Sequence, residues 1–198
     1  MARGRRFRSL PAALLAVAVL LGGCAAAQSR GPVQEAAGAP AADFTLPDQD
    51  GRAVTLQDLR GKAVVVDFIY TNCPPDEACP LLTAKLAALQ QRLPTAGLAE
   101  RVVILSITFD PDRDTPDVLK AYARQFGAEL TNWHFLRGDE AQTRAIAKAY
   151  GVAYEHSDHG DIGHSAFIMV VDPQGRIRAW EPPGFSGRDL LEVVQRVL

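Results

Sequence analysis

The sequence lacks a long hydrophobic run, an excess of positive charge and any internal repeat. Its main apolar stretch, residues 10–21, is shorter than the ~20 residues that a transmembrane helix needs. The formal net charge of the 198-residue chain is −2, which is the wrong sign for a protein that binds nucleic acid. These absences argue against a membrane-spanning helix and against a nucleic-acid partner.

The first 23 residues have the pattern of an export signal, with four arginines ahead of the apolar stretch. The stretch LGGC, which ends at Cys24, resembles the lipobox of bacterial lipoproteins, whose cysteine is acylated; an ordinary signal with a chance cysteine is the alternative. Loss of four arginines and no acids would change the net charge from −2 to −6. We expect a lipoprotein signal peptide at residues 1–23 and a lipid anchor at Cys24, on the periplasmic side of a bacterial membrane.

The chain changes in composition after the anchor. Residues 25–42 are rich in Ala, Gly, Pro and Gln and have almost no large apolar side chains. Such a segment cannot bury a core, so with Cys24 it is predicted to form a lipidated, flexible tether. Residues 43–198 are long enough for a single α/β domain.

Hydrophobic patterning within that domain alternates between strands and helices. Almost uninterrupted apolar runs predict buried strands, and the order of elements predicts an α/β fold with a mixed sheet flanked by helices and an N-terminal β-hairpin extension. The predicted hairpin pairs residues 44–46 with 53–56; the strands are 63–70, 101–109, 133–136, 165–171 and 176–180; the helices are 80–93, the segment capped by Asp114 or Thr115 that ends near Gly127, 140–150 and 186–198.

Only Cys73 and Cys79 remain if lipidation consumes Cys24. They follow a predicted central strand and precede a helix, at the edge where open α/β sheets usually keep their active sites. The helix N-terminus is expected to favour the thiolate form of Cys79. The pair can be a structural disulfide, a redox pair or part of a metal site.

Each alternative has a physical cost. A disulfide that closes a seven-residue loop gives a stabilisation at the low end of the ~2–4 kcal/mol range. Redox pairs of the thioredoxin type normally have two intervening residues, and the five here, PPDEA, loosen that geometry without forbidding a disulfide. A peroxiredoxin is excluded, since its threonine three positions before the cysteine is replaced by Tyr70. A metal site needs at least one further ligand.

The chain has four histidines, so each can be weighed as that ligand. His134 lies in an apolar segment and is expected to be packed or half-exposed, whereas His156 and His159 lie in a polar stretch and are expected to be solvated. His164 precedes a buried strand whose end could lie beside the cysteine loop. Two thiolates and an imidazole suit Cu(I), or Cu(II) with added ligands. Zinc requires a fourth ligand such as His159 or Asp161.

Several motifs together resemble the SCO/SenC family, thioredoxin-fold copper proteins of bacterial and mitochondrial membranes. They include VVVDFIYTNCP, ILSITFDPDRDTPDVLKAYARQFG and GHSAFIMVVDPQGRIRAW. The resemblance implies a thioredoxin-like fold and copper ligands at Cys73, Cys79 and His164. It also implies a metallochaperone that assembles the copper centre of cytochrome c oxidase, with the copper-bearing subunit or another periplasmic copper or thiol protein as partner.

The chain departs from that family at two places. The family usually has three residues between its cysteines and an acid before its histidine, whereas this chain has five residues and Gly163. Asp158 or Asp161 could replace the acid, and Asp76 and Glu77 would raise the pKa of nearby thiols but attract a cation. The alternative function is a thiol-disulfide oxidoreductase that uses Cys73 and Cys79 as a redox-active pair without a metal.

Overall fold

The computed structural model describes residues 1, 34–35, 38–157, 162–184 and 187–198. Six strands of the described chain form one sheet in the order β1-β10-β9-β4-β5-β6. At its centre β4 (Ala63–Ile69) and β5 (Val102–Thr108) are parallel, and every residue in both strands is buried. Such strands need apolar side chains on both faces, which explains their uninterrupted hydrophobic runs.

The outer strands make the sheet mixed. β6 (Trp133–Leu136) continues the parallel part beside β5, and β9 (Ile168–Val171) runs antiparallel to β4. A turn then leads to β10 (Ile177–Glu181), which pairs antiparallel with β9. The predicted mixed sheet is therefore confirmed.

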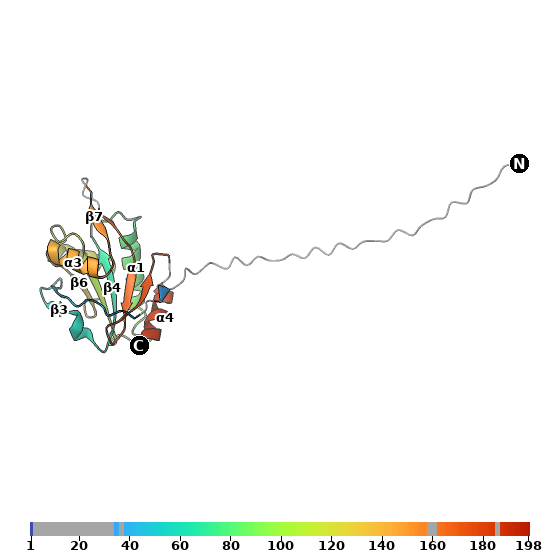
Figure 1. Cartoon of the computed structure of the whole chain (residues 1–198), viewed down its shortest axis with the longest axis horizontal. Helices are drawn as coiled ribbons and strands as arrows, with labels where there is room; N and C mark the ends of the chain where they lie inside the picture. The colour runs from blue at the N-terminus through green and yellow to red at the C-terminus, as the bar shows by residue number, and fades with distance from the viewer. Residues whose placement is uncertain (2–33, 36–37, 158–161, 185–186) are drawn as a thin grey trace.

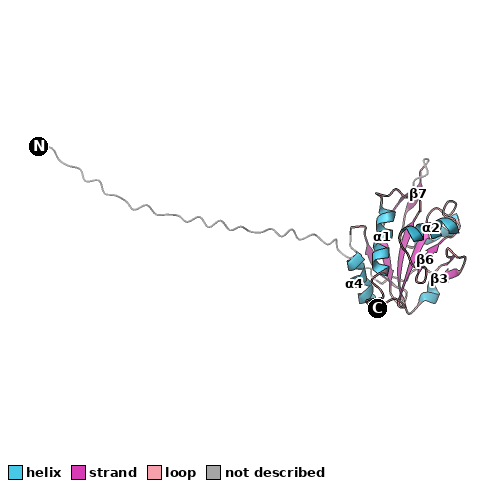
Figure 2. Ribbon diagram, turned by 180° about the vertical axis from the view of Figure 1, so that it is seen from behind, coloured by secondary structure: helices cyan, strands magenta, loops and turns pink. Residues whose placement is uncertain are grey.

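Helices cover both faces of this sheet (Figures 1 and 2). One face packs against α1 (Ala78–Gln90), α2 (Pro116–Gln125) and α4 (Gly187–Val197). The other face packs against α3 (Glu140–Ala149) and the N-terminal hairpin. Alternate residues of the central strands enter the two cores, so the sheet is buried between two layers.

The N-terminal hairpin is confirmed as β2 (Thr45–Pro47) paired with β3 (Ala53–Thr55), followed by the short 3-10 helix η1 (Leu56–Leu59). The Asp48 carboxylate closes its turn by accepting the N–H groups of Asp50 and Arg52, both at 2.9 Å. This side chain supplies acceptors that the backbone of the turn lacks.

Residues that precede 43, the predicted start of the domain, already pack against the domain. β1 (Gln34–Glu35) pairs with β10, the Ala41 N–H donates to Gly175 O at 2.9 Å, and the Tyr150 hydroxyl donates to Ala42 O at 2.8 Å. The predicted signal peptide and Cys24 lie outside the described residues. Within the described part of the chain, no helix has the length and hydropathy needed to cross a bilayer.

A small hairpin corrects the prediction for residues 155–171. A polar loop followed by one strand over 165–171 was expected, but β7 (Tyr154–His156) pairs with β8 (Ile162–His164), and β9 begins only at Ile168. Tyr154 and Ile162 bury their side chains against the domain, whereas Glu155 and Gly163 are exposed. These three-residue strands depend on that packing, which a mainly polar sequence does not reveal.

Candidate metal centre

The loop that carries the cysteines leaves the end of β4 and is folded into two tight turns. The Cys73 N–H donates to Tyr70 O at 3.3 Å, and the Glu77 N–H donates to Pro74 O at 3.0 Å. Helix α1 then starts at Ala78, which places Cys79 in its first turn. The two turns take up the long spacer without separating its ends.

Cys73, Cys79 and His164 converge as predicted. One ligand atom from each, the two sulfurs and an imidazole nitrogen, all lie within 4.8 Å of one another. Both cysteines are free thiols in this structure, Cys79 fully buried and Cys73 half-buried. His164 reaches them from β8, so the site is built by the cysteine loop on one side and the β7–β8 hairpin on the other (Figure 1).

The His164 ring is fixed by hydrogen bonds and by aromatic packing. Its Nδ1 lies 3.0 Å from Ser165 O, and since a carbonyl only accepts, Nδ1 carries the proton. The Nε2 lone pair therefore points into the site, 2.9 Å from Cys79 Sγ. The Phe109 ring packs against the His164 ring with 4.9 Å between the ring centroids, and the Tyr70 ring contacts it edge-on with 6.0 Å between the centroids.

The contact with Ser165 O orients the His164 ring, a role that was expected of an acidic residue near the histidine. Asp158 and Asp161, the predicted substitutes, lie outside the described residues, as does His159. The carbonyl of Ser165 selects the tautomer whose free nitrogen can bind a metal, as partners of ligating histidines generally do.

The electrostatics of Cys79 differ from the prediction. Burial raises the pKa of this thiol well above its usual range, and proximity to Cys73 raises it further, which outweighs the lowering by the Tyr70 backbone. The orphan N–H groups of the helix start were expected to favour the thiolate, but full removal from water dominates. Without a cation the buried sulfur is thus held as a thiol.

Asp114 is a site-forming residue whose role the sequence did not disclose. It was expected only as a possible helix cap, yet Thr115 caps α2 and Asp114 is buried under the cysteine loop. Its carboxylate accepts the Thr71 hydroxyl at 2.5 Å, the Thr71 N–H at 3.2 Å and the Thr108 hydroxyl. These bonds fix the chain two residues before Cys73.

The convergent set fits a soft, low-coordinate ion. Ligand atoms about 2.0–2.3 Å from a shared ion lie roughly 3.5–4 Å apart, so a separation within 4.8 Å requires only small adjustments. Two sulfurs and one imidazole match the preference of Cu(I). Among the described residues these three are the only such group, so the fourth ligand that zinc prefers is not seen there.

The other described histidines have structural partners away from the site. His134 is half-buried with its Nδ1 3.3 Å from an oxygen of Asp48, and His156 is exposed with its Nε2 3.9 Å from an oxygen of Glu140. His134 was predicted to be packed or half-exposed and His156 to be solvated, and both predictions are confirmed.

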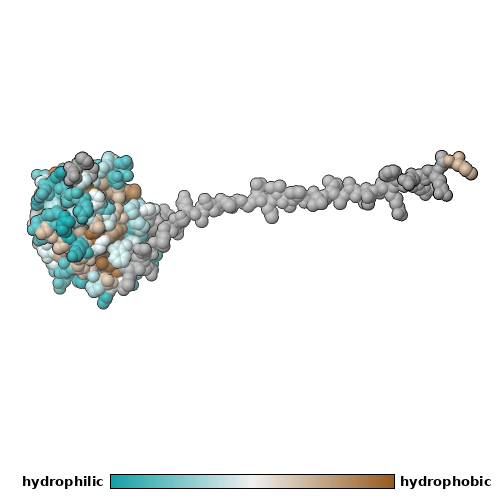
Figure 3. Space-filling model, turned by 45° about the horizontal axis from the view of Figure 1, so that its top comes forward, coloured by the Kyte–Doolittle hydropathy of each residue, from teal (hydrophilic) through white to brown (hydrophobic). Residues whose placement is uncertain are grey.

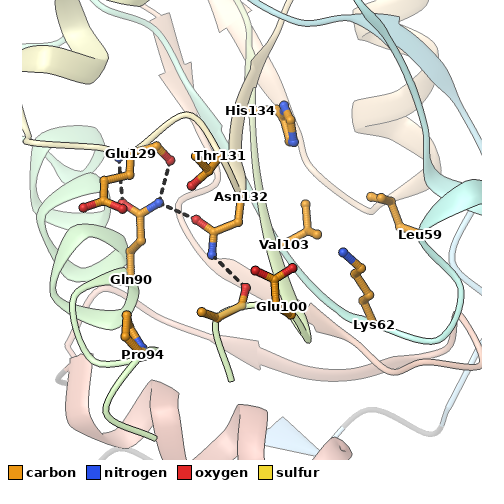
Figure 4. A pocket seen from close by; sticks show the side chains of 11 residues that line it. Leu59, Lys62, Gln90, Pro94, Glu100, Val103, Glu129, Thr131, Asn132 and His134 are labelled. Carbon is orange, nitrogen blue, oxygen red and sulfur yellow. Dashed lines mark hydrogen bonds between the residues drawn. The ribbon is translucent and has the colours of Figure 1, made fainter. Parts of the chain in front are cut away.

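A cavity of about 190 Å³ lies at the other end of the parallel strands (Figure 4). Lys62, Glu100 and Asn132 line it and precede β4, β5 and β6, whereas the cysteines follow β4. Gln90 donates to Asn132 Oδ1 and to Glu129 O, both at 2.7 Å, so these polar groups satisfy one another. The cavity is separate from the metal-ligand cluster.

Comparison with known proteins finds similar sequences and similar folds. A curated relative, the SCO1 protein homolog of Bacillus subtilis, is 31% identical over 137 residues, which are 68% of this chain and 69% of the relative. The structure of Bradyrhizobium japonicum ScoI with copper bound has a TM-score of 0.69 and 29% identity, and the match covers 81% of this chain and all of that one.

A third similar protein is BsSco, described as a member of the Sco family of cytochrome c oxidase assembly proteins with a disulfide switch. Its structure has a TM-score of 0.71 and 27% identity over 81% of this chain and 94% of that chain. These likenesses confirm the predicted thioredoxin-like fold. Because the SCO1/SenC family profile also matches residues 33–198, the chain belongs to the SCO1/SenC family.

Proposed function

We propose that this protein binds copper through Cys73, Cys79 and His164 and delivers it to the copper-bearing subunit of cytochrome c oxidase. The observation that carries the proposal is the convergence of two sulfurs and one imidazole nitrogen within 4.8 Å. The copper-bound structure of one relative and the oxidase-assembly role of another support it.

The surroundings of the site suit the exchange of an ion with another protein. Cys73 is half-buried and Cys79 fully buried, so an incoming or leaving ion meets the Cys73 sulfur first. Figure 3 shows a face of the domain on which hydrophilic residues gather mainly on one side, with paler and apolar residues beside them. Leu81, two residues beyond Cys79, is 47% exposed and offers a partner an apolar contact beside the site.

The proposal predicts one copper ion per chain, lost on Cys73→Ser or Cys79→Ser and held less tightly by His164→Ala. Each cysteine change leaves a single thiolate, which holds Cu(I) poorly against a competing chelator, whereas His164→Ala leaves both soft thiolates in place. Copper content after dialysis against a Cu(I) chelator measures the effect. Cys24→Ser and His156→Ala are the matched controls and should retain copper. Equal copper in the ligand variants and the controls would refute the metal site.

A second function is supported by the same two thiols. As a thiol-disulfide reductase, Cys73 would attack a disulfide of the target, and Cys79 would then displace the target's sulfur. The two thiols lose two electrons and two protons and become a disulfide, while the target gains them as two thiols. A strongly reducing potential in a protein isolated without copper would favour this function over copper delivery.

We further propose that the protein acts on the periplasmic side of a bacterial membrane, held there by an acylated Cys24. The support is the sequence alone: an arginine-rich start, an apolar stretch and the lipobox-like LGGC. A membrane anchor would place the copper site beside membrane-bound oxidase subunits.

A further inference from the structure

Tyr154 lies directly opposite His164 in the β7–β8 hairpin. Its side chain is buried, and its ring centroid lies 4.6 Å from that of Phe109. The His164 ring packs on the same Phe109 ring, with 4.9 Å between the centroids. Phe109 is fully buried and stacks on Phe68 of β4, so both rings of the hairpin rest on a fixed part of the core.

The Tyr154 hydroxyl extends beyond this aromatic contact to helix α3. It donates to Oε1 of the Glu140 carboxylate at 3.2 Å. Arg144, one helical turn after Glu140, places its Nη2 2.6 Å from the same oxygen. The Arg144 guanidinium also lies over the Tyr154 ring, 4.9 Å from the ring centroid. Two side chains of α3 thus hold one side chain of the hairpin.

The start of α3 is a firm support for this contact. The Asp139 carboxylate accepts the Gln142 N–H at 2.7 Å, and the Gln142 side chain accepts the Asp139 N–H at 3.0 Å. This capping box fixes the first turn of the helix, which contains Glu140. The acceptor of the Tyr154 hydroxyl is therefore held in place independently of the hairpin.

The hairpin needs such an attachment because it is small. Within the described chain, β7 and β8 have three residues each and form a two-stranded sheet of their own. An isolated pair of strands is marginally stable in water. Ring contacts are compatible with several offset and tilted arrangements, whereas a hydrogen bond to a carboxylate is directional. The Tyr154–Glu140 bond therefore fixes the position of the hairpin, and with it the position of His164.

We propose that Tyr154 is a positioning residue for His164: its hydroxyl, bound to Glu140, holds the β7–β8 hairpin closed over the cysteine loop. Loss of this bond lowers the fraction of chains in which His164 reaches the sulfurs, so the apparent affinity for an ion that needs all three ligands falls with that fraction. The effect on copper rests on the proposed function. The effect on the hairpin does not, because it involves only contacts within the chain.

Tyr154→Phe tests the inference by removing the hydroxyl while keeping the ring on Phe109. The Ser165 N–H donates to Ala153 O at 2.9 Å, at the end of the hairpin nearest the core, so its hydrogen exchange reports local opening of the hairpin. Without metal, this exchange should become about 2- to 10-fold faster, the range expected for one hydrogen bond. Glu140→Ala removes the acceptor of the same bond and should have a similar effect.

With copper, the test is a double-mutant cycle with His164→Ala. Tyr154→Phe should accelerate copper release to a chelator by a similar factor in the parent protein. It should have no effect in the His164→Ala variant, because no imidazole remains there to be positioned. Equal acceleration in both backgrounds would show that Tyr154 does not act through His164 and would overturn the proposal.

Each substitution has a matched control. Tyr150→Phe also removes a buried hydroxyl, one that donates to Ala42 O, and Asp117→Ala also removes an exposed acid from the first turn of a helix. Both controls should match the parent protein in Ser165 exchange and in copper release. If Tyr154→Phe also leaves Ser165 exchange unchanged, the inference is wrong. If the parent protein binds no copper, the proposed function fails, while Ser165 exchange still decides the role of Tyr154.

Discussion

Asp67 is a fully buried acidic residue that lies outside the proposed metal site. It lies in the middle of β4, fully buried, with Oδ1 accepting the Ser106 hydroxyl at 2.6 Å. Its Oδ2 has no hydrogen-bond partner among the described residues. Burial raises the pKa of this carboxyl to about 7. An ionised carboxylate is thus unfavourable there, and the neutral acid persists to near-neutral pH.

Asp67 should make the protein less stable as pH rises from about 4 to about 7. Over that interval the unfolded chain releases the proton that the folded chain retains, so the free energy of unfolding falls, by a few kcal/mol at most. Asp67→Asn should remove this part of the pH dependence. Urea unfolding at several pH values between 4 and 8 measures the slope.

The slope of the unfolding free energy against pH, and not the stability at any one pH, tests the raised pKa of Asp67. The asparagine amide brings an N–H group without a partner, which costs about 1–3 kcal/mol at every pH. Asp58→Asn makes the same substitution at an exposed position and should keep the slope of the parent protein. An unchanged slope for Asp67→Asn would contradict a raised pKa at this site.

Residue types and spacing identified the proposed ligand set but not the residues that support it. Cys73, Cys79 and His164 could be predicted because soft ligands are scarce in this chain and two sit at strand ends. Tyr70 and Asp114 could not, because a tyrosine after a strand and an aspartate before a helix usually have local roles. The Thr71–Asp114 hydrogen bond and the Tyr70–His164 ring contact join segments 43 and 94 residues apart, which only the fold brings together.

Among the elements, the loops after β4 and β5 are joined by the Asp114 carboxylate. It holds the Thr71 N–H and hydroxyl from one loop and the Thr108 hydroxyl from the end of β5. Three donors on one buried acceptor group make the two loops a single unit. The position of Cys73 therefore depends on a residue 41 positions later in the chain.

Asp114→Ala should destabilise the protein by about 1–3 kcal/mol, because it leaves buried donors on Thr71 and Thr108 unpaired. The cysteine loop should also loosen, so that copper is released faster than from the parent protein. Thermal unfolding and chelator competition measure the two effects.

Asp112→Ala serves as the control, since Asp112 is exposed in the same loop. It should change neither stability nor release by more than a small amount. Release rates that stay normal in Asp114→Ala would show that the carboxylate stabilises the fold without positioning the site.

Elements with a strong pattern could be predicted, whereas elements that depend on tertiary contacts could not. The apolar runs of β4 and β5 and the marked start of α2 correspond closely to the structure. β7 and β8 lack such a pattern; Tyr154 is held by the Phe109 ring at 4.6 Å, and Phe109 in turn packs on His164. The hairpin that presents the histidine is thus specified by the core beneath it.

At the scale of the whole molecule, membrane attachment would act through the N-terminal segment. Cys24→Ser should release the protein from membranes, since the mature chain would lose the acyl groups that hold it. Immunoblots of soluble and membrane fractions measure this. Cys73→Ser changes a different cysteine and should leave the protein in the membrane fraction; equal release of both variants, or of neither, would refute the anchor at Cys24.

The short pairing of β1 with β10 limits how far the domain can lie from the proposed anchor at Cys24. Since Gln34 and Glu35 are fixed to the edge of the sheet, only ten residue steps separate Gln34 from the proposed anchor at Cys24. At 3.3–3.6 Å per residue, a chain of that length spans at most about 35 Å. If Cys24 is the anchor, so short a tether would limit the domain to acceptors that lie close to the bilayer surface, and distance from the membrane would restrict its choice of partners.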